Sequence, residues 1–299
     1  MATVTSQLRR VLPAPVKGLV RPWYHHARDM RYEMNLRSLG TSKKDLLILA
    51  TIAKSGTHYM KFLFANYVKL ASGPDEGPVS PTEMNTMLPN IWHNAYLGPR
   101  NYEDPTPLLD SLHLHDIPRS HYSYQPYHWD DSKVLHLYRN PLDYAVSLFH
   151  YKYTNRTHLS GAVADPGDAL NLRLDNYAQI YSSYREAARQ GTGSLLRFSY
   201  EDLVRYPETC LRIVVKWLGV EPEPSIIQKA ARYSSRDTVS QMEEAGETIN
   251  PTATNFTGTF VRDGSIGQWK EYFDSAAVDT VSEKFGRYGI DLDEFTLEA

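Results

Sequence analysis

Residues 46–57 read LLILATIAKSGT, an apolar run that ends directly in a short polar loop. The apolar run predicts a buried β-strand near 45–51, and the residues after it predict a helix near 57–71. Between the two, Gly56 lets the backbone approach an anion closely, and the free N–H groups at the helix start point toward that anion. With Lys54 as a point charge, the segment predicts a phosphate-binding loop between a strand and a helix.

The order of residues in this loop differs from that of nucleotide triphosphatases. Their loop reads G-x-x-x-x-G-K-[ST], with the lysine after the second glycine. Here Lys54 precedes Gly56, and no glycine stands upstream of it in the loop. A small-molecule kinase, which would need Mg²⁺ and the usual order, is therefore the weaker alternative.

Further apolar runs alternate with helical patterns along the chain. Residues 133–138 predict a second strand, followed by a helix near 141–153 that starts with proline, a favourable first helical residue. A third strand is expected at 195–198 and another helix over 207–218. Because strands and helices alternate, the expected fold is α/β. It is a single P-loop-like domain with a central parallel sheet flanked by helices on both faces.

Three polar stretches separate these elements, at 71–107, 154–168 and 243–267. They are predicted to be irregular loops, where lids and acceptor pockets often lie.

Four segments carry a resemblance to a known family. KSGT at 54–57 is similar to a loop of the form T-x-P-K-S-G-T-x-W, and RNPLDYAVS at 139–147 to R-N-P-x-D-x-x-V-S. FSYEDL at 198–203 matches F-x-Y-E-D-L, and FVRDGSIGQWK at 260–270 resembles F-x-R-K-G-x-x-G-D-W-K. The chain therefore resembles the sulfotransferases that use 3′-phosphoadenosine 5′-phosphosulfate (PAPS), in particular the cytosolic type. The resemblance implies one sulfotransferase domain over residues 1–299, with an N-terminal extension at about 1–43.

The same resemblance implies PAPS as co-substrate, 3′,5′-bisphosphoadenosine (PAP) as product and no metal. It implies that Lys54 neutralises the leaving 5′-phosphate and that Arg139 and Ser147 hold the 3′-phosphate. Asp263 departs from the family pattern, which usually has a basic residue there, so one phosphate contact is missing or reversed in sign. The residues implied in nucleotide binding are Lys54, Ser55, Gly56, Thr57, His58, Tyr59, Arg139, Ser147, Tyr200, Phe260, Arg262 and Gly264.

An acceptor hydroxyl needs a general base, and histidine is the natural side chain near neutral pH. The family places this base in a K-T-H segment, which PRSHY at 118–122 resembles, so His121 is the predicted base. Arg119 in the same segment is expected to help hold the transferring sulfonate. His115 and His113 are rival bases, and Asp116 could orient either of them.

The acceptor is expected to be a small molecule with a hydroxyl or amine, and a saccharide or glycolipid is the alternative. The aromatic segment 122–129, with Trp92, His93 and Tyr96, could line its pocket or could equally be packing. A non-catalytic binder of PAP is a further alternative, since it would keep Lys54 but could dispense with a base. The dimer motif K-x-x-x-T-V-x-x-x-E is not matched after Lys270.

Composition sets broader limits. A net charge of −3 argues against general nucleic-acid binding. The single Cys210 suits a reducing compartment and a role as a small core residue. No apolar run is long enough to span a membrane, so a cytoplasmic protein is expected. The basic segment 7–31 is expected to pack on the domain, with contact to an anionic membrane surface as the alternative.

Overall fold

The computed structural model describes residues 46–88, 107–114, 116–124, 131–155, 161, 163–191, 194–249 and 259–295. The predicted N-terminal extension and the basic segment within it lie outside the described residues. So do His115 and most of the aromatic residues expected near an acceptor, including Trp92, His93 and Tyr96.

The described part of the chain forms a four-stranded sheet in the order β2-β1-β3-β4, in which every pairing is parallel. The strands are β1 (Leu47–Thr51), β2 (Arg119–Ser120), β3 (Lys133–Tyr138) and β4 (Ser194–Ser199). In the centre, Leu49 of β1 pairs with Leu135 of β3, which in turn pairs with Leu196 of β4. The predicted parallel sheet and its three strands are confirmed, and β2 adds a short fourth.

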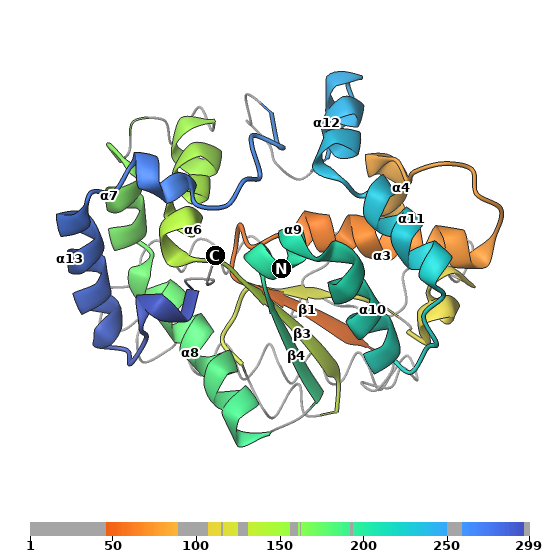
Figure 1. The fold of residues 1–299 in the computed structure, drawn as a ribbon, viewed down its shortest axis with the longest axis horizontal. Coiled ribbons are helices and arrows are strands. Elements are labelled where there is room, and N and C mark those ends of the chain that lie inside the picture. The colour runs from red at the N-terminus through yellow and green to blue at the C-terminus, as the bar shows by residue number, and fades with distance from the viewer. Residues whose placement is uncertain are drawn as a thin grey trace, which may run out of the picture.

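Alternate residues of β1 serve two separate cores. Leu47 and Leu49 belong to one buried cluster, and Ile48 and Ala50 belong to the other. Because successive side chains of a strand point to opposite faces, a strand buried on both faces reads as the continuous apolar run seen in the sequence. Helices accordingly cover both faces of the sheet (Figure 1).

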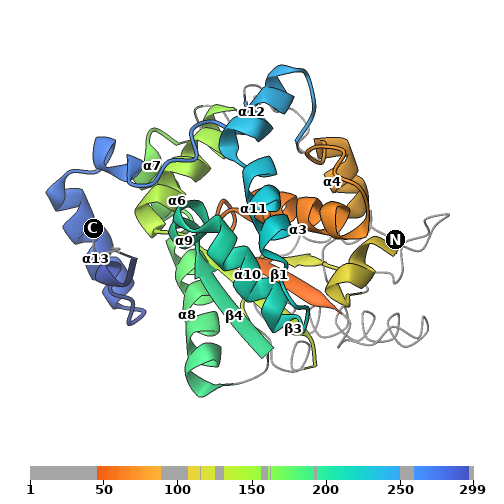
Figure 2. The ribbon, with the colours of Figure 1, turned by 45° about the vertical axis from the view of Figure 1, so that its right-hand side comes forward.

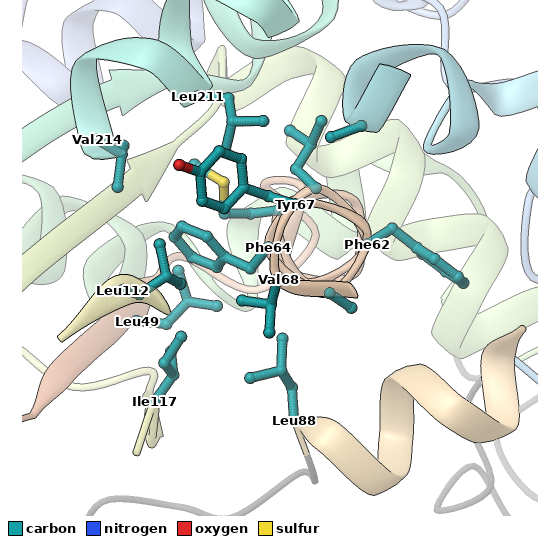
Figure 3. Packing of buried hydrophobic residues seen from close by; sticks show 14 of the residues in the cluster. Leu49, Phe62, Phe64, Tyr67, Val68, Leu88, Leu112, Ile117, Leu211 and Val214 are labelled. Carbon is teal, nitrogen blue, oxygen red and sulfur yellow. The ribbon is translucent and has the colours of Figure 1, made fainter. Parts of the chain in front are cut away.

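One face is covered by α3 (Thr57–Ser72), α10 (Pro207–Trp217) and α11 (Pro224–Tyr233). Figure 3 shows Phe64 of α3 beside Leu49 of β1, and Tyr67 of α3 beside Leu211 of α10. The other face is covered by α6 (Pro141–Leu148), α8 (Leu174–Gln190) and α13 (Ser275–Gly286), which lie together in both ribbon views (Figures 1 and 2).

The helix predicted near 141–153 is two elements. Asn140 caps α6 by accepting hydrogen bonds from the N–H groups of Leu142 and Asp143, and Pro141 is the first helical residue. After Leu148 the chain continues as a π-helical segment, Phe149–Thr154. Such single π turns shift the side chains that follow them relative to a regular helix.

Two predicted loops contain helices. The helix α4 (Pro81–Met87) lies inside the 71–107 stretch, and α7 (Pro166–Asn171) occupies the end of the 154–168 stretch. Ser80 and Glu83 form a reciprocal capping box at the start of α4, a signal that the sequence already carried. The prediction of uniform loops there was wrong.

The remaining helices complete the framework. They are α9 (Tyr200–Arg205), α12 (Arg236–Glu244), and the 3₁₀ segments Pro107–Leu112, Gln268–Glu271 and Leu292–Phe295. Cys210 is buried in the core as a free thiol, which confirms its predicted packing role. Within the described residues, no helix has the length and apolar character needed to cross a membrane.

Candidate active site

A cavity of about 640 Å³ lies at the carboxyl ends of the parallel strands β1 and β3, where the helices that follow them begin. It gathers residues from the loop after β1, from β2, from the start and end of α6, from α9, from α12 and from the 259–268 segment. Thirteen of the fourteen predicted site residues line it, namely Lys54, Gly56, Thr57, His58, Tyr59, Arg119, His121, Arg139, Ser147, Tyr200, Phe260, Arg262 and Gly264. Ser55 is the exception, because its side chain is fully buried behind the loop.

The loop after β1 has an unusual backbone that brings it close to α9. Lys54 and Gly56 both have left-handed backbone conformations, with φ of 69° and 88°. A Cβ atom on Gly56 would lie 2.9 Å from Cδ2 of Tyr200, closer than real side chains approach. The first turn of α3 follows at once, since the N–H of Met60 donates to the carbonyl of Gly56 at 2.9 Å. Only glycine fits at position 56, because the backbone is left-handed there and a Cβ atom would be too close to Tyr200. The backbone of this loop and the free N–H groups at the start of α3 together form a surface suited to an anion.

The Lys54 ammonium lies over two aromatic rings. Its Nζ is 4.0 Å from the ring centroid of Tyr151 and 5.1 Å from that of Phe260. A cation over an aromatic face is stabilised by the ring quadrupole. The sequence had assigned Phe260 to the site but not Tyr151, which the π-helical segment after α6 carries into the cavity.

His121 is anchored to the end of β1. Its Nδ1 lies 2.7 Å from the carbonyl oxygen of Thr51 and 2.9 Å from Oγ1 of the same residue. A carbonyl oxygen only accepts hydrogen bonds, so Nδ1 is the protonated nitrogen and Nε2 carries the basic lone pair. Burial lowers the pKa of His121 to about 4, with the nearby Arg119 cation adding to the effect and the Thr51 hydrogen bond opposing it. The imidazole is therefore neutral at pH 7.

Two other described histidines, His113 and His58, are placed less suitably for a base. His113 is exposed and does not line the cavity, and Asp116 lies beside Leu46, before β1 begins and so at the opposite edge of the sheet. His58 does line the cavity, where its ring packs edge-on against Phe260 with centroids 4.8 Å apart. Burial and the cations around it, Lys61 foremost, lower its pKa well below the ordinary value.

Arg139 occupies the next strand end. Its side chain is almost fully buried, donates from Nη2 to the carbonyl of Ser265 at 3.1 Å, and lies over the ring of Tyr200 at 4.3 Å. The hydroxyl of Tyr200 donates to the carbonyl of Gly264 at 2.7 Å. The arginine is therefore held beside the 259–268 segment by residues from two of the other three motifs.

Asp143 fastens that same segment to α6. Its carboxylate accepts the N–H groups of Gly267 at 2.7 Å and of Trp269 at 3.0 Å. Arg262 donates to the side-chain oxygen of Gln268 in the same turn. These contacts bring the guanidinium of Arg262 to the cavity where Arg139 lies.

The cavity fits a nucleotide that bears several phosphates. Five cationic side chains line it, a high density for a chain with net charge −3; they are Lys54, Arg119, Arg139, Arg236 and Arg262. Arginine forks suit phosphate oxygens, and the free N–H groups at the start of α3 suit an anion. Among the described residues, no group of three or more metal-ligating side chains is present.

Comparison with known proteins identifies the family. A sequence model of the family described as "Sulfotransferase domain" matches residues 44–289. The chain belongs to the sulfotransferase family.

Several characterised sulfotransferases resemble this family member along most of their length. The 3-alpha-hydroxysteroid sulfotransferase of Cavia porcellus is 26% identical over 246 residues, which are 79% of this chain and 81% of the relative. Sulfotransferase 6B1 of Danio rerio is 23% identical over 251 residues, 82% of this chain and 78% of the relative. The chain is thus a PAPS-dependent sulfotransferase enzyme, and the predicted family is confirmed.

Solved structures share the fold. Mouse sulfotransferase SULT7A1, complexed with PAP, superposes with a TM-score of 0.59 at 20% identity and covers 89% of this chain and 92% of that one. Retinol dehydratase in complex with retinol and PAP gives a TM-score of 0.58 at 18% identity, covering 89% and 86%. This likeness confirms the predicted α/β architecture.

Proposed function

We propose that this sulfotransferase moves the sulfuryl group of PAPS, in line, to a hydroxyl or amine of a small-molecule acceptor, with His121 as general base and Lys54 stabilising the leaving phosphate. The observation that carries the proposal is the anchored, neutral imidazole of His121 in the cavity that the Lys54 loop and Arg139 also line.

The nucleotide would lie along the carboxyl edge of the sheet. The backbone of the 54–57 loop and the start of α3 would hold its 5′-phosphosulfate, and Arg139, Ser147 and Arg262 would hold its 3′-phosphate. Tyr59 and Tyr200 both line the cavity from partly or fully buried positions, where an adenine ring could stack on an aromatic face.

The chemical step needs one proton acceptor and one electrostatic stabiliser. Nε2 of His121 takes the acceptor proton as the acceptor oxygen or nitrogen bonds to sulfur, and the bond between sulfur and the 5′-phosphate oxygen breaks. Lys54 neutralises the charge that collects on that oxygen, and Arg119 faces the sulfonate. The products are the sulfated acceptor and PAP, and His121 returns its proton to solvent.

The cavity favours an acceptor with an apolar body. Apolar side chains line it beside the cations, including Phe62 of α3, Val204 of α9, Val239 of α12 and Ile249 after α12. Two of the relatives are named for hydroxysteroids, and retinol dehydratase is also known in complex with androsterone and PAP. These observations support a small, largely apolar hydroxyl compound over a saccharide or glycolipid.

A paired measurement of binding and turnover tests the proposal. Wild type, His121→Asn and the exposed-histidine control His113→Asn are titrated with PAP without magnesium and with ATP in the presence of magnesium. They are then assayed with labelled PAPS and a panel of hydroxylated acceptors. We expect all three to bind PAP, and only His121→Asn to lose turnover, by about 100-fold or more. Unchanged turnover in His121→Asn would reject the assigned base, and tighter binding of ATP with magnesium than of PAP would favour a kinase.

A further inference from the structure

The charge of Asp263 stands out in the cavity. It is the one acidic residue among the described residues that line a cavity otherwise rich in arginine and lysine. The carbonyl oxygen of its neighbour Gly264 accepts a hydrogen bond from the hydroxyl of Tyr200, and the guanidinium of Arg139 lies over the ring of that tyrosine. An unneutralised carboxylate at this point would repel a phosphate held by Arg139.

Arg236, the first residue of α12, meets this carboxylate. Its Nη1 donates to the carbonyl oxygen of Asp263 at 2.8 Å and lies 3.4 Å from carboxylate oxygen Oδ1. The hydroxyl of Ser265 donates to the other carboxylate oxygen at 2.8 Å. Asp263 thus binds the guanidinium through both its backbone and its side chain, which fixes where Arg236 points.

The position of Arg236 places it beside the groups that face a phosphate. A Cβ atom added to Gly264 would lie 3.5 Å from Cδ of Arg236 and 3.4 Å from the hydroxyl oxygen of Tyr200. Arg236 and Tyr200, whose ring lies against Arg139, therefore both approach the same glycine. In both ribbon views α12 and the segment before Gln268 lie at the same end of the molecule, at the top of the picture (Figures 1 and 2).

We propose that Arg236 is a ligand of the 3′-phosphate of the donor nucleotide, and that Asp263 is a positioning residue that holds Arg236 for this contact. The inference rests on the proposed nucleotide site. Nη1 is engaged by Asp263 and Nε lies 3.4 Å from Asp237, so Nη2 is the nitrogen of the planar fork that would donate to the phosphate. A guanidinium can keep one edge on a carboxylate and offer the other to a phosphate because its donors diverge in one plane.

The ion pair itself contributes little to folding. The side chains of Arg236 and Asp263 are 58% and 41% exposed, and exposed pairs are weak because solvent screens them. Variants at these positions should therefore fold, which makes a binding test possible.

The test compares two nucleotides that differ only in the 3′-phosphate. PAP and adenosine 5′-monophosphate are titrated calorimetrically into wild type, Arg236→Gln, the control Arg232→Gln and the double variant Arg236→Gln/Asp263→Asn. Arg232 is an exposed arginine near the end of α11 that does not line the cavity. We expect Arg236→Gln to weaken PAP by about 10-fold or more and the monophosphate by less than about twofold, because a charge-assisted hydrogen bond to phosphate is lost. Arg232→Gln should match wild type.

The double variant separates a direct contact from simple neutralisation. With Asp263 also neutral, repulsion disappears, so PAP affinity should recover in part and stay below that of wild type. Full recovery would show that Arg236 only neutralises Asp263, and equal weakening of both nucleotides by Arg236→Gln would show that it contacts something other than the 3′-phosphate; either result overturns the inference. If wild type itself does not bind PAP, the proposed nucleotide site fails as well, a result that is distinct from the other two.

Discussion

Nδ1 of His121 lies 2.7 Å from the carbonyl oxygen of Thr51, the last residue of β1. The same strand end delivers the Lys54 loop, and Oγ1 of Thr51 lies 2.8 Å from Oγ1 of Thr57 at the start of α3. The proposed base and the proposed phosphate-binding loop are thus fixed to one strand end. This arrangement sets the tautomer of His121 and its place relative to the Lys54 loop.

The low pKa of His121 predicts that activity is lost at low pH only well below the pH at which an ordinary histidine becomes protonated. Only the neutral imidazole accepts a proton, so activity should stay level as pH falls from 8 to about 6, and decline as the pH approaches the value of about 4. The measurement is kcat/KM for PAPS against pH, which reports the free enzyme. Enzyme held at each pH and then assayed at pH 7 controls for acid inactivation. A limb centred near the ordinary value of about 6.5 would contradict the buried, neutral base.

Gly56 should tolerate no larger residue, for a reason separable from backbone strain. Gly56→Ala places a methyl group 2.9 Å from Tyr200, whereas Gly219 has nearly the same φ, 90°, with nothing within 4 Å of its Cβ position. Both alanines should cost about 1 kcal/mol in unfolding free energy through the left-handed backbone. Only Gly56→Ala should also weaken PAP binding, by about 10-fold or more, as the loop shifts away from α9. Equal PAP affinity in the two variants would mean that the close approach to Tyr200 does not shape the site.

The sequence was sufficient for three of the four strands and for four of the five cationic side chains that line the cavity, because the signals for them are local. Strand β1 is buried on both faces, so its apolar run is unbroken, and the loop residues follow it without a gap. Lys54, Arg139 and Tyr200 each lie within three residues of a strand end, so a parallel sheet must bring them to one edge.

Other parts of the site depend on contacts that no local pattern encodes. Tyr151 reaches Lys54 because a π turn follows α6, and Arg236 reaches Asp263 because α12 packs against a segment 27 residues later in the chain. The anchoring of His121 likewise depends on its hydrogen bond to Thr51, which joins residues 70 positions apart.

His136 should make folding stability depend on pH below about 6.5. Its ring is fully buried in a stack on Tyr184, with centroids 3.9 Å apart, and burial lowers its pKa well below the ordinary value. The unfolded chain therefore takes up a proton below about pH 6.5 that the folded chain does not, and stability falls as the pH falls.

Urea unfolding of wild type and His136→Gln between pH 8.5 and 5 measures this effect. One such histidine changes the unfolding free energy by up to about 1.4 kcal/mol per pH unit, so the slope below pH 6.5 should be smaller in the variant by that amount. His58 and His121 remain and keep some slope. Above pH 7.5 the slopes should coincide, which serves as an internal control. An identical slope in the acid range would mean that the folded protein protonates His136 as easily as the unfolded chain.

Tyr151 should act on turnover through Lys54 more than on nucleotide affinity. Its ring lies 4.0 Å below the Lys54 ammonium and restricts where that charge can move. Tyr151→Leu removes the aromatic face but keeps an apolar side chain, so kcat should fall by about 10-fold while PAP affinity changes by less than about threefold. Tyr151→Phe keeps the face and should retain most of the activity, which separates the ring from the hydroxyl. If the phenylalanine variant loses as much activity as the leucine variant, the hydroxyl beside Arg119 matters more than the cation–ring contact, and Lys54 is positioned by other groups.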